Sequence, residues 1–119
     1  MGKIDYKSAG VNIDAGNEAV NRIKDGVKST FTSNVLTGIG SFGSLYDLKP
    51  ILENYDNPVM VQSIDGVGTK TIIARKLGKF DTIGIDLLSA AANDILVMGA
   101  RPLTFLDYIA NDKLNPEIV

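Results

Sequence analysis

The chain has 119 residues, which is enough for about one domain. Its 45% hydrophobic and 22% charged content is typical of a globular protein, and a net charge of −2 without a basic run gives no sign of a nucleic-acid partner. Because it contains neither cysteine nor histidine, these residues hold no disulfide, thiolate metal site or Ser-His or Cys-His nucleophile pair. Any chemistry here must use carboxylates, lysines, amides or a bound metal.

The first half of the chain reads as a helix followed by loops. Residues up to about 10 are polar and lack the apolar segment of a signal peptide. Helical spacing of apolar residues predicts a helix over 14–28, with Asp14 as its N-cap. A glycine-rich loop follows at 38–43, and 47–55 is ambiguous, with room for a short helical turn around Pro50.

The second half alternates strands and helices. The apolar run 59–64 predicts a buried strand, and 70–77 a helix that ends at Gly78. Residues 82–85 form either a short strand or the lead-in to a helix over 86–98, which Gly99 ends. A last strand is expected over 102–110, and Asn115-Pro116-Glu117 has the pattern of a helix start, which suggests a protein cut inside its next element. The longest nearly apolar run, 87–98, is too short to cross a bilayer, so we expect a cytoplasmic protein without a membrane partner.

The turn Asp65-Gly66-Val67-Gly68-Thr69-Lys70 is the most informative stretch, because it joins a predicted strand to a predicted helix. A carboxylate there can hold a hard cation, and glycines let the backbone N–H groups of 66–69 approach an anion at a helix start. Lys70 adds a positive point charge. These residues suggest a site for metal and phosphate; the alternative is an Asp-Gly turn that only links two elements.

The helix predicted over 86–98 is apolar nearly all round, which is typical of a buried helix. Asp86, Ser89 and Asn93 share one face of it, and Asp94 lies beside them. A buried carboxylate must be paired, hydrogen-bonded or metal-bound. Either Asn93 and Asp94 satisfy neighbouring backbone groups, or Asp94 and Asp65 hold a metal together.

The loop Gly38-Ile39-Gly40-Ser41-Phe42-Gly43 matches the G-x-G-x-x-G pattern of dinucleotide-binding folds. Its surroundings do not fit, because neither a clear strand before it nor a long helix after it is expected. A mobile lid over phosphates is the better interpretation, since glycines permit close approach and movement. An ordinary surface loop is the alternative.

Several long motifs occur together and in order: residues 6–17, the glycine loop, Asp65 to Lys70, and 81–108 with its Asn93-Asp94 pair and Phe105-Leu106-Asp107-Tyr108. From about Tyr6 to its last residue the chain closely resembles the N-terminal part of the aminoimidazole ribonucleotide synthetases, also called phosphoribosylformylglycinamidine cyclo-ligases. Two mild departures are Ser41, where glycine is usual, and Asn12, where aspartate is common.

The resemblance implies an ATP-dependent ligase of purine biosynthesis that closes the ring of formylglycinamidine ribonucleotide, with magnesium as the cation. ATP would activate the formyl amide oxygen as a phosphate ester, and the neighbouring nitrogen would displace the phosphate. By motif, Asp65 and Asp94, with Asn93, would hold magnesium and phosphates, and Lys70 would neutralise phosphate charge. Cofactor contacts would come from the loop, the turn and one further lysine: Gly40, Phe42, Gly43, Gly66, Gly68, Thr69 and Lys24.

The resemblance also implies an α/β fold in which a mixed sheet packs with helices and is completed as a barrel across a homodimer. Residues 1–119 would form a single N-terminal ATP-binding and dimerising domain of a longer two-domain enzyme, and the isolated chain would be inactive. The alternatives are a dimerising, nucleotide-binding fragment without turnover, or another ATP-using member of the same superfamily.

Overall fold

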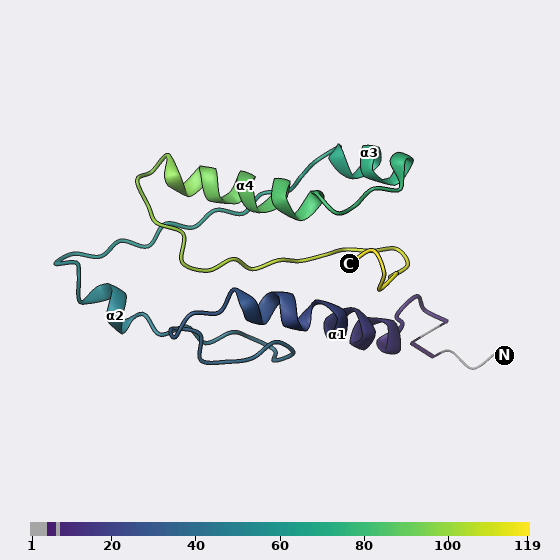
Figure 1. The fold of residues 1–119 in the computed structure, drawn as a ribbon, viewed down its shortest axis with the longest axis horizontal. Helices are drawn as coiled ribbons and strands as arrows, with labels where there is room; N and C mark the ends of the chain where they lie inside the picture. The colour runs from purple at the N-terminus through teal and green to yellow at the C-terminus, as the bar shows by residue number, and fades with distance from the viewer. Residues whose placement is uncertain (1–4, 7) are drawn as a thin grey trace. The chain divides into compact units, whose positions relative to one another are not determined.

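The structure of the chain, a computed structural model, describes residues 5, 6 and 8–119 and divides into two compact units. One unit holds the described residues up to Pro58 together with Ile109–Val119, and the other is Val59–Tyr108. The described residues form four α-helices (Figure 1). Residues 1–4, where no signal peptide was expected, and Lys7 of the opening motif lie outside the described residues.

Helix α1 (Ile13–Ser29) confirms the helix predicted over 14–28. Its N-cap is Asn12, whose side-chain Oδ1 accepts a hydrogen bond from the Ala15 backbone N–H at 3.2 Å. The expectation that Asp14 caps this helix was therefore wrong. Asp14 lies in the first turn, where a carboxylate is stabilised by the positive end of the helix dipole. Ala19, on the inner face, is buried.

The ambiguous stretch 47–55 contains a single short helix, α2 (Lys49–Leu52), with Pro50 in its first turn. Just before it, the segments flanking the glycine loop pair with each other through an antiparallel bridge between Val35 and Tyr46. The Leu36 N–H bonds to the Leu45 carbonyl at 2.8 Å, and the Asp47 N–H to the Asn34 carbonyl at 2.7 Å. These bonds close the base of the loop.

In the second unit, α3 (Lys70–Leu77) has the predicted bounds. Gly78 follows it with a φ of 62°, the left-handed conformation that favours glycine, and the Lys79 N–H returns to the Ala74 carbonyl at 3.0 Å. Helix α4 (Ile83–Leu96) packs against α3. It begins at Ile83, so residues 82–85 lead into the helix and are not a strand.

The interior position expected for α4 was wrong for this chain, since none of its residues is buried. Among the described residues α3 is the only helix that packs against it, so much of its apolar surface stays in contact with solvent. The helix ends at Leu96, two residues before the predicted end at Met98. Gly99 has a φ of 75°, and the Ala100 N–H donates a hydrogen bond to the Ile95 carbonyl at 3.1 Å. Gly99 thus closes the helix as expected.

The two segments that were expected to be strands are 59–64 and 102–110. Both are extended, drawn-out segments, and neither forms a β-ladder with another described residue (Figure 1). Several of their large apolar side chains are strongly exposed, with Ile64 at 99% and Tyr108 at 91% of full exposure. The mixed sheet and the barrel across a dimer stay predictions.

Near the end of the chain, Asn115 caps a turn rather than a full helix. Its Oδ1 accepts from the Glu117 N–H at 3.0 Å, and its carbonyl accepts from the Ile118 N–H at 3.0 Å. As for the membrane, none of the helices among the described residues combines the length and the apolar character needed to cross a bilayer.

Candidate functional site

The predicted strand-to-helix turn has an open backbone. Asp65 Oδ1 accepts a hydrogen bond from the Gly66 N–H at 2.6 Å, and Gly68 has a φ of 55°, which a residue with a side chain rarely adopts. A Cβ built on either glycine would meet no atom within 4 Å. A side chain at either position would therefore have room, as it would at the other described glycines.

Lys70, the first residue of α3, forms an ion pair with Asp86 in the first turn of α4. Its Nζ lies 3.0 Å from Asp86 Oδ1, and the two side chains keep 57% and 41% of their full exposure. A pair as exposed as this contributes about 0–1 kcal/mol to stability. The cation expected to meet phosphate thus has an internal carboxylate as its partner, and that partner holds it weakly.

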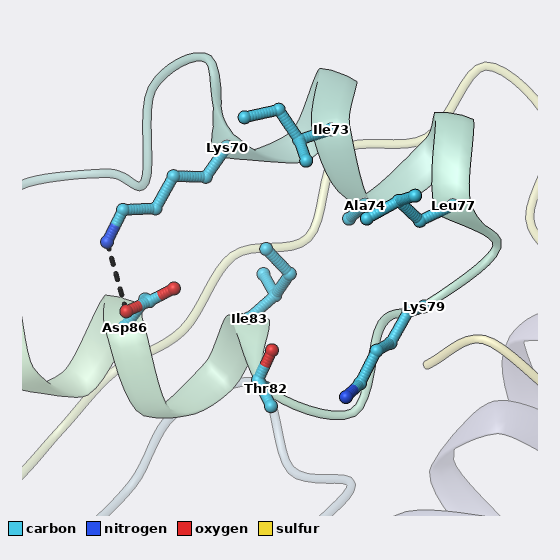
Figure 2. A pocket seen from close by; sticks show the side chains of 8 residues that line it. All are labelled: Lys70, Ile73, Ala74, Leu77, Lys79, Thr82, Ile83 and Asp86. Carbon is cyan, nitrogen blue, oxygen red and sulfur yellow. Dashed lines mark ion pairs between the residues drawn. The ribbon is translucent and has the colours of Figure 1, made fainter.

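The same pair borders a hollow of about 180 Å³ between α3 and α4. The apolar residues that line it are Ile73, Ala74, Leu77 and Ile83. The polar and charged residues that line it are Lys70, Lys79, Thr82 and Asp86. Figure 2 shows Lys70 at one end, joined to Asp86, and Lys79 at the other end. A lysine thus lies at each end of the hollow, and the one at the Lys70 end is paired with Asp86.

Asp94 has a long-range partner. The Ser63 hydroxyl donates a hydrogen bond to Asp94 Oδ2 at 2.7 Å, which links the segment before the turn to α4. Ser63 precedes Asp65 by two positions, and side chains two apart share a side of an extended chain. The contact brings the segment that precedes Asp65 to α4.

A divalent cation would find hard oxygen donors in Asp65 and Asp94, which suit magnesium by their chemistry. Among the described residues, however, no group of three or more acidic side chains comes together as a metal cage. Magnesium usually keeps several waters and is held by one or two carboxylates together with substrate phosphates. The donor set fits that mode of binding and does not fit a cage made by the protein alone.

The glycine loop belongs to the other unit, as does Lys24, an exposed residue of α1. Gly40 has a φ of 98°, and the Phe42 side chain is fully exposed. Besides the backbone bonds at its base, the Leu45 N–H bonds to Thr37 Oγ1 at 2.9 Å. The loop thus projects from a base that hydrogen bonds close. The dinucleotide-binding motif requires a long helix directly after the loop, and only the short α2 follows it, so this interpretation does not fit.

The predicted site residues of the turn 65–70, Asn93 and Asp94 belong to one unit. Their recorded side-chain partners are residues outside the predicted set: Asp86 for Lys70 and Ser63 for Asp94. Sequence reasoning missed two partners, Asp86 and Ser63. Asp86 was recognisable by its place on the polar stripe of α4, and Ser63 by its spacing from Asp65.

Comparison with known proteins identifies the family of the chain. Residues 48–119 match the family described as AIR synthase related protein, N-terminal domain, and the chain belongs to this family. This confirms the resemblance read from the motifs.

The relatives that the chain resembles are named phosphoribosylformylglycinamidine cyclo-ligase. The one from Carboxydothermus hydrogenoformans is 56% identical over 119 residues, which is all of this chain and 34% of the relative. Those from Thermoanaerobacter pseudethanolicus and Crocosphaera subtropica are 55% and 51% identical, over 97% and 96% of this chain and 33% of each relative. The chain thus spans about a third of the length of the curated relatives it matches.

Proposed function

We propose that this chain is the N-terminal domain of a phosphoribosylformylglycinamidine cyclo-ligase, the enzyme that uses ATP to close formylglycinamidine ribonucleotide to aminoimidazole ribonucleotide in purine biosynthesis. The observation that carries the proposal is 56% identity to an enzyme of that name along the whole chain. A small-molecule biosynthetic role in the cytoplasm belongs to the same proposal.

In this function the unit Val59–Tyr108 would hold the phosphates of ATP. The N–H groups of Gly68 and Thr69 would point at phosphate oxygens, and Lys70 would neutralise their charge. The Gly66 N–H would join them once it leaves Asp65 Oδ1, to which it donates in this structure. Lys70 is accessible for this role, since its side chain keeps 57% of its full exposure. Phosphoryl transfer depends on positioning and charge neutralisation more than on a nucleophilic side chain, so the absence of histidine and cysteine is no obstacle.

Asp65 and Asp94, with Asn93 beside them, would bind magnesium together with the phosphates. When bound, magnesium would supply positive charge to the phosphate oxygens. The hydrogen bond from Ser63 would fix the Asp94 carboxylate and leave its Oδ1 for the cation. Asp65, Asp94 and Lys70 are thus the residues that we assign to the reaction.

The glycine loop would act as the lid over ATP, through Gly40, Phe42 and Gly43. A closed base supports this role, because it lets the tip move while its ends stay paired. An exposed phenylalanine at the tip is available to cover a bound nucleotide. Lys24 would be a further nucleotide contact.

The chain would act as one ATP-binding and dimerising domain. Its drawn-out segments 59–64 and 102–110 expose apolar side chains, and such a surface favours a partner. A two-fold homodimer in which these segments pair as strands of a shared α/β barrel would cover them.

The competing function is a dimerising, nucleotide-binding module without turnover. Another ATP-using reaction of the superfamily is the second alternative. Genetic complementation separates the first from the enzyme. The intact reading frame that carries this chain should restore growth without purines to a bacterium that lacks its cyclo-ligase, while residues 1–119 alone should not. Failure of the intact frame, at normal expression, would refute the proposal.

A further inference from the structure

We propose that Asp86 is a specificity-determining residue: an internal counter-ion of Lys70 that makes the site prefer a metal-bound polyphosphate to the free anion. The inference rests on the proposed role of Lys70 at the phosphates of ATP. Its basis is the 3.0 Å ion pair between the two side chains at the edge of the α3–α4 hollow (Figure 2).

The location of Lys70 explains why it needs a counter-ion. It is the first residue of α3, a helix without an acidic residue in its first turn. A cation at that end meets the positive pole of the helix dipole, which is unfavourable. Asp86 supplies the missing negative charge from α4, and it does so from that helix's own first turn, where a carboxylate is stabilised. Asp86 thus balances the charge of the Lys70 ammonium group.

The exposure of the pair lets an external anion compete. Lys70 keeps 57% and Asp86 41% of full side-chain exposure, so solvent and solutes reach both. An ammonium group has three N–H donors, so Lys70 can bind a phosphate oxygen while it stays near Asp86. That phosphate would then lie within a few ångströms of the Asp86 carboxylate, and the two negative charges repel.

A divalent cation on the polyphosphate would remove much of this repulsion. Asp65 and Asp94 belong to the same unit, and any negative charge that they bring near the phosphate would act in the same direction. Asp86 would therefore weaken binding of the free anion more than binding of its magnesium complex. The site would select the form of the nucleotide that carries its own metal.

The test is calorimetric titration of the intact protein with inorganic tripolyphosphate, once without divalent cation and once with magnesium. Asp86→Asn removes the charge and keeps a similar shape. Asp81→Asn is the matched control, because Asp81 is an exposed aspartate near the start of α4 that forms no ion pair among the described residues. Circular dichroism checks that both variants remain folded.

We expect Asp86→Asn to bind free tripolyphosphate about threefold or more tightly at low salt, and the magnesium complex with a smaller change. Asp81→Asn should match the wild type, and Lys70→Met combined with Asp86→Asn should lose the gain. Unchanged or weaker binding of the free anion by Asp86→Asn would overturn the inference and leave the proposed function intact. If neither wild type nor variants bind any polyphosphate, both the phosphate site and this inference are refuted.

Discussion

Ser63 and Asp94 are joined by a 2.7 Å hydrogen bond across 31 positions of sequence. Both residues are exposed, so water competes for each of them. The bond is therefore better suited to orienting the Asp94 carboxylate than to stabilising the chain.

Ser63→Ala should weaken magnesium-dependent ATP binding while leaving stability nearly unchanged. A net hydrogen-bond contribution of about 0.5–1.5 kcal/mol corresponds to roughly a 2- to 12-fold rise in the Kd. Calorimetric titration of the intact protein with Mg-ATP measures this. Ser89→Ala, an exposed serine of α4, is the control and should keep the wild-type Kd. An unchanged Kd in Ser63→Ala would show that the bond has no orienting role.

Asp94→Asn should abolish magnesium-dependent use of ATP and leave the fold intact. The amide oxygen can still accept the hydrogen bond from Ser63, so the link between the segment and α4 survives while the charge is lost. Because Asp94 is exposed, the loss of its charge should change the stability of the metal-free protein only a little. Steady-state turnover against magnesium concentration, with a thermal unfolding curve, checks both parts. A variant with normal turnover and magnesium dependence would make Asp94 structural.

Gly68→Ala should destabilise the protein by about 1–2 kcal/mol, the cost of a left-handed residue with a side chain. The added methyl group meets no atom within 4 Å, so the cost comes from the φ of 55° alone. Gly66→Ala also points into free space, and Gly66 is not among the glycines with positive φ. It is the matched control. Urea unfolding of both variants compares them, and equal stabilities would contradict the assigned turn geometry.

The protein should form a two-fold dimer through its drawn-out segments, and Ile64→Lys should disrupt it. Ile64 is 99% exposed in the single chain, so a lysine there should not disturb the fold of the monomer. It should weaken the dimer if association buries this side chain. Ile72→Lys, on a half-exposed residue of α3, is the control and should leave the dimer intact. Sedimentation equilibrium at micromolar concentration measures both. A clean monomer mass for the wild-type protein would count against the dimer.

Much of the helical structure could be predicted because its signals are local. Spacing of apolar residues located α1, and a nearly continuous apolar run located α4, although its start at Ile83 was expected at residue 86. Gly78 marked the end of α3 because only glycine adopts its conformation at little cost. The cap of α1 was misplaced because Asn12 and Asp14 are both good caps two positions apart. The pattern of α4 shows that its surface needs cover, but a pattern cannot show what covers it.

The candidate site was predictable where its residues are neighbours in the sequence and form a short motif, as in the turn from Asp65 to Lys70. The partners were not, since the contacts of Lys70 with Asp86 and of Asp94 with Ser63 join residues far apart in the chain. The bridge between Val35 and Tyr46 escaped prediction for a related reason, because a single antiparallel bridge leaves no alternating pattern in the sequence.

The central claim is tested most directly by supplying the intact protein with formylglycinamidine ribonucleotide, ATP and magnesium and measuring aminoimidazole ribonucleotide and ADP. The account predicts equal amounts of the two products, at a rate within the usual enzymatic range of about 1–10³ per second, and no comparable turnover by residues 1–119 alone. ATP bound or hydrolysed without formation of the closed ring by the intact protein would contradict the claim.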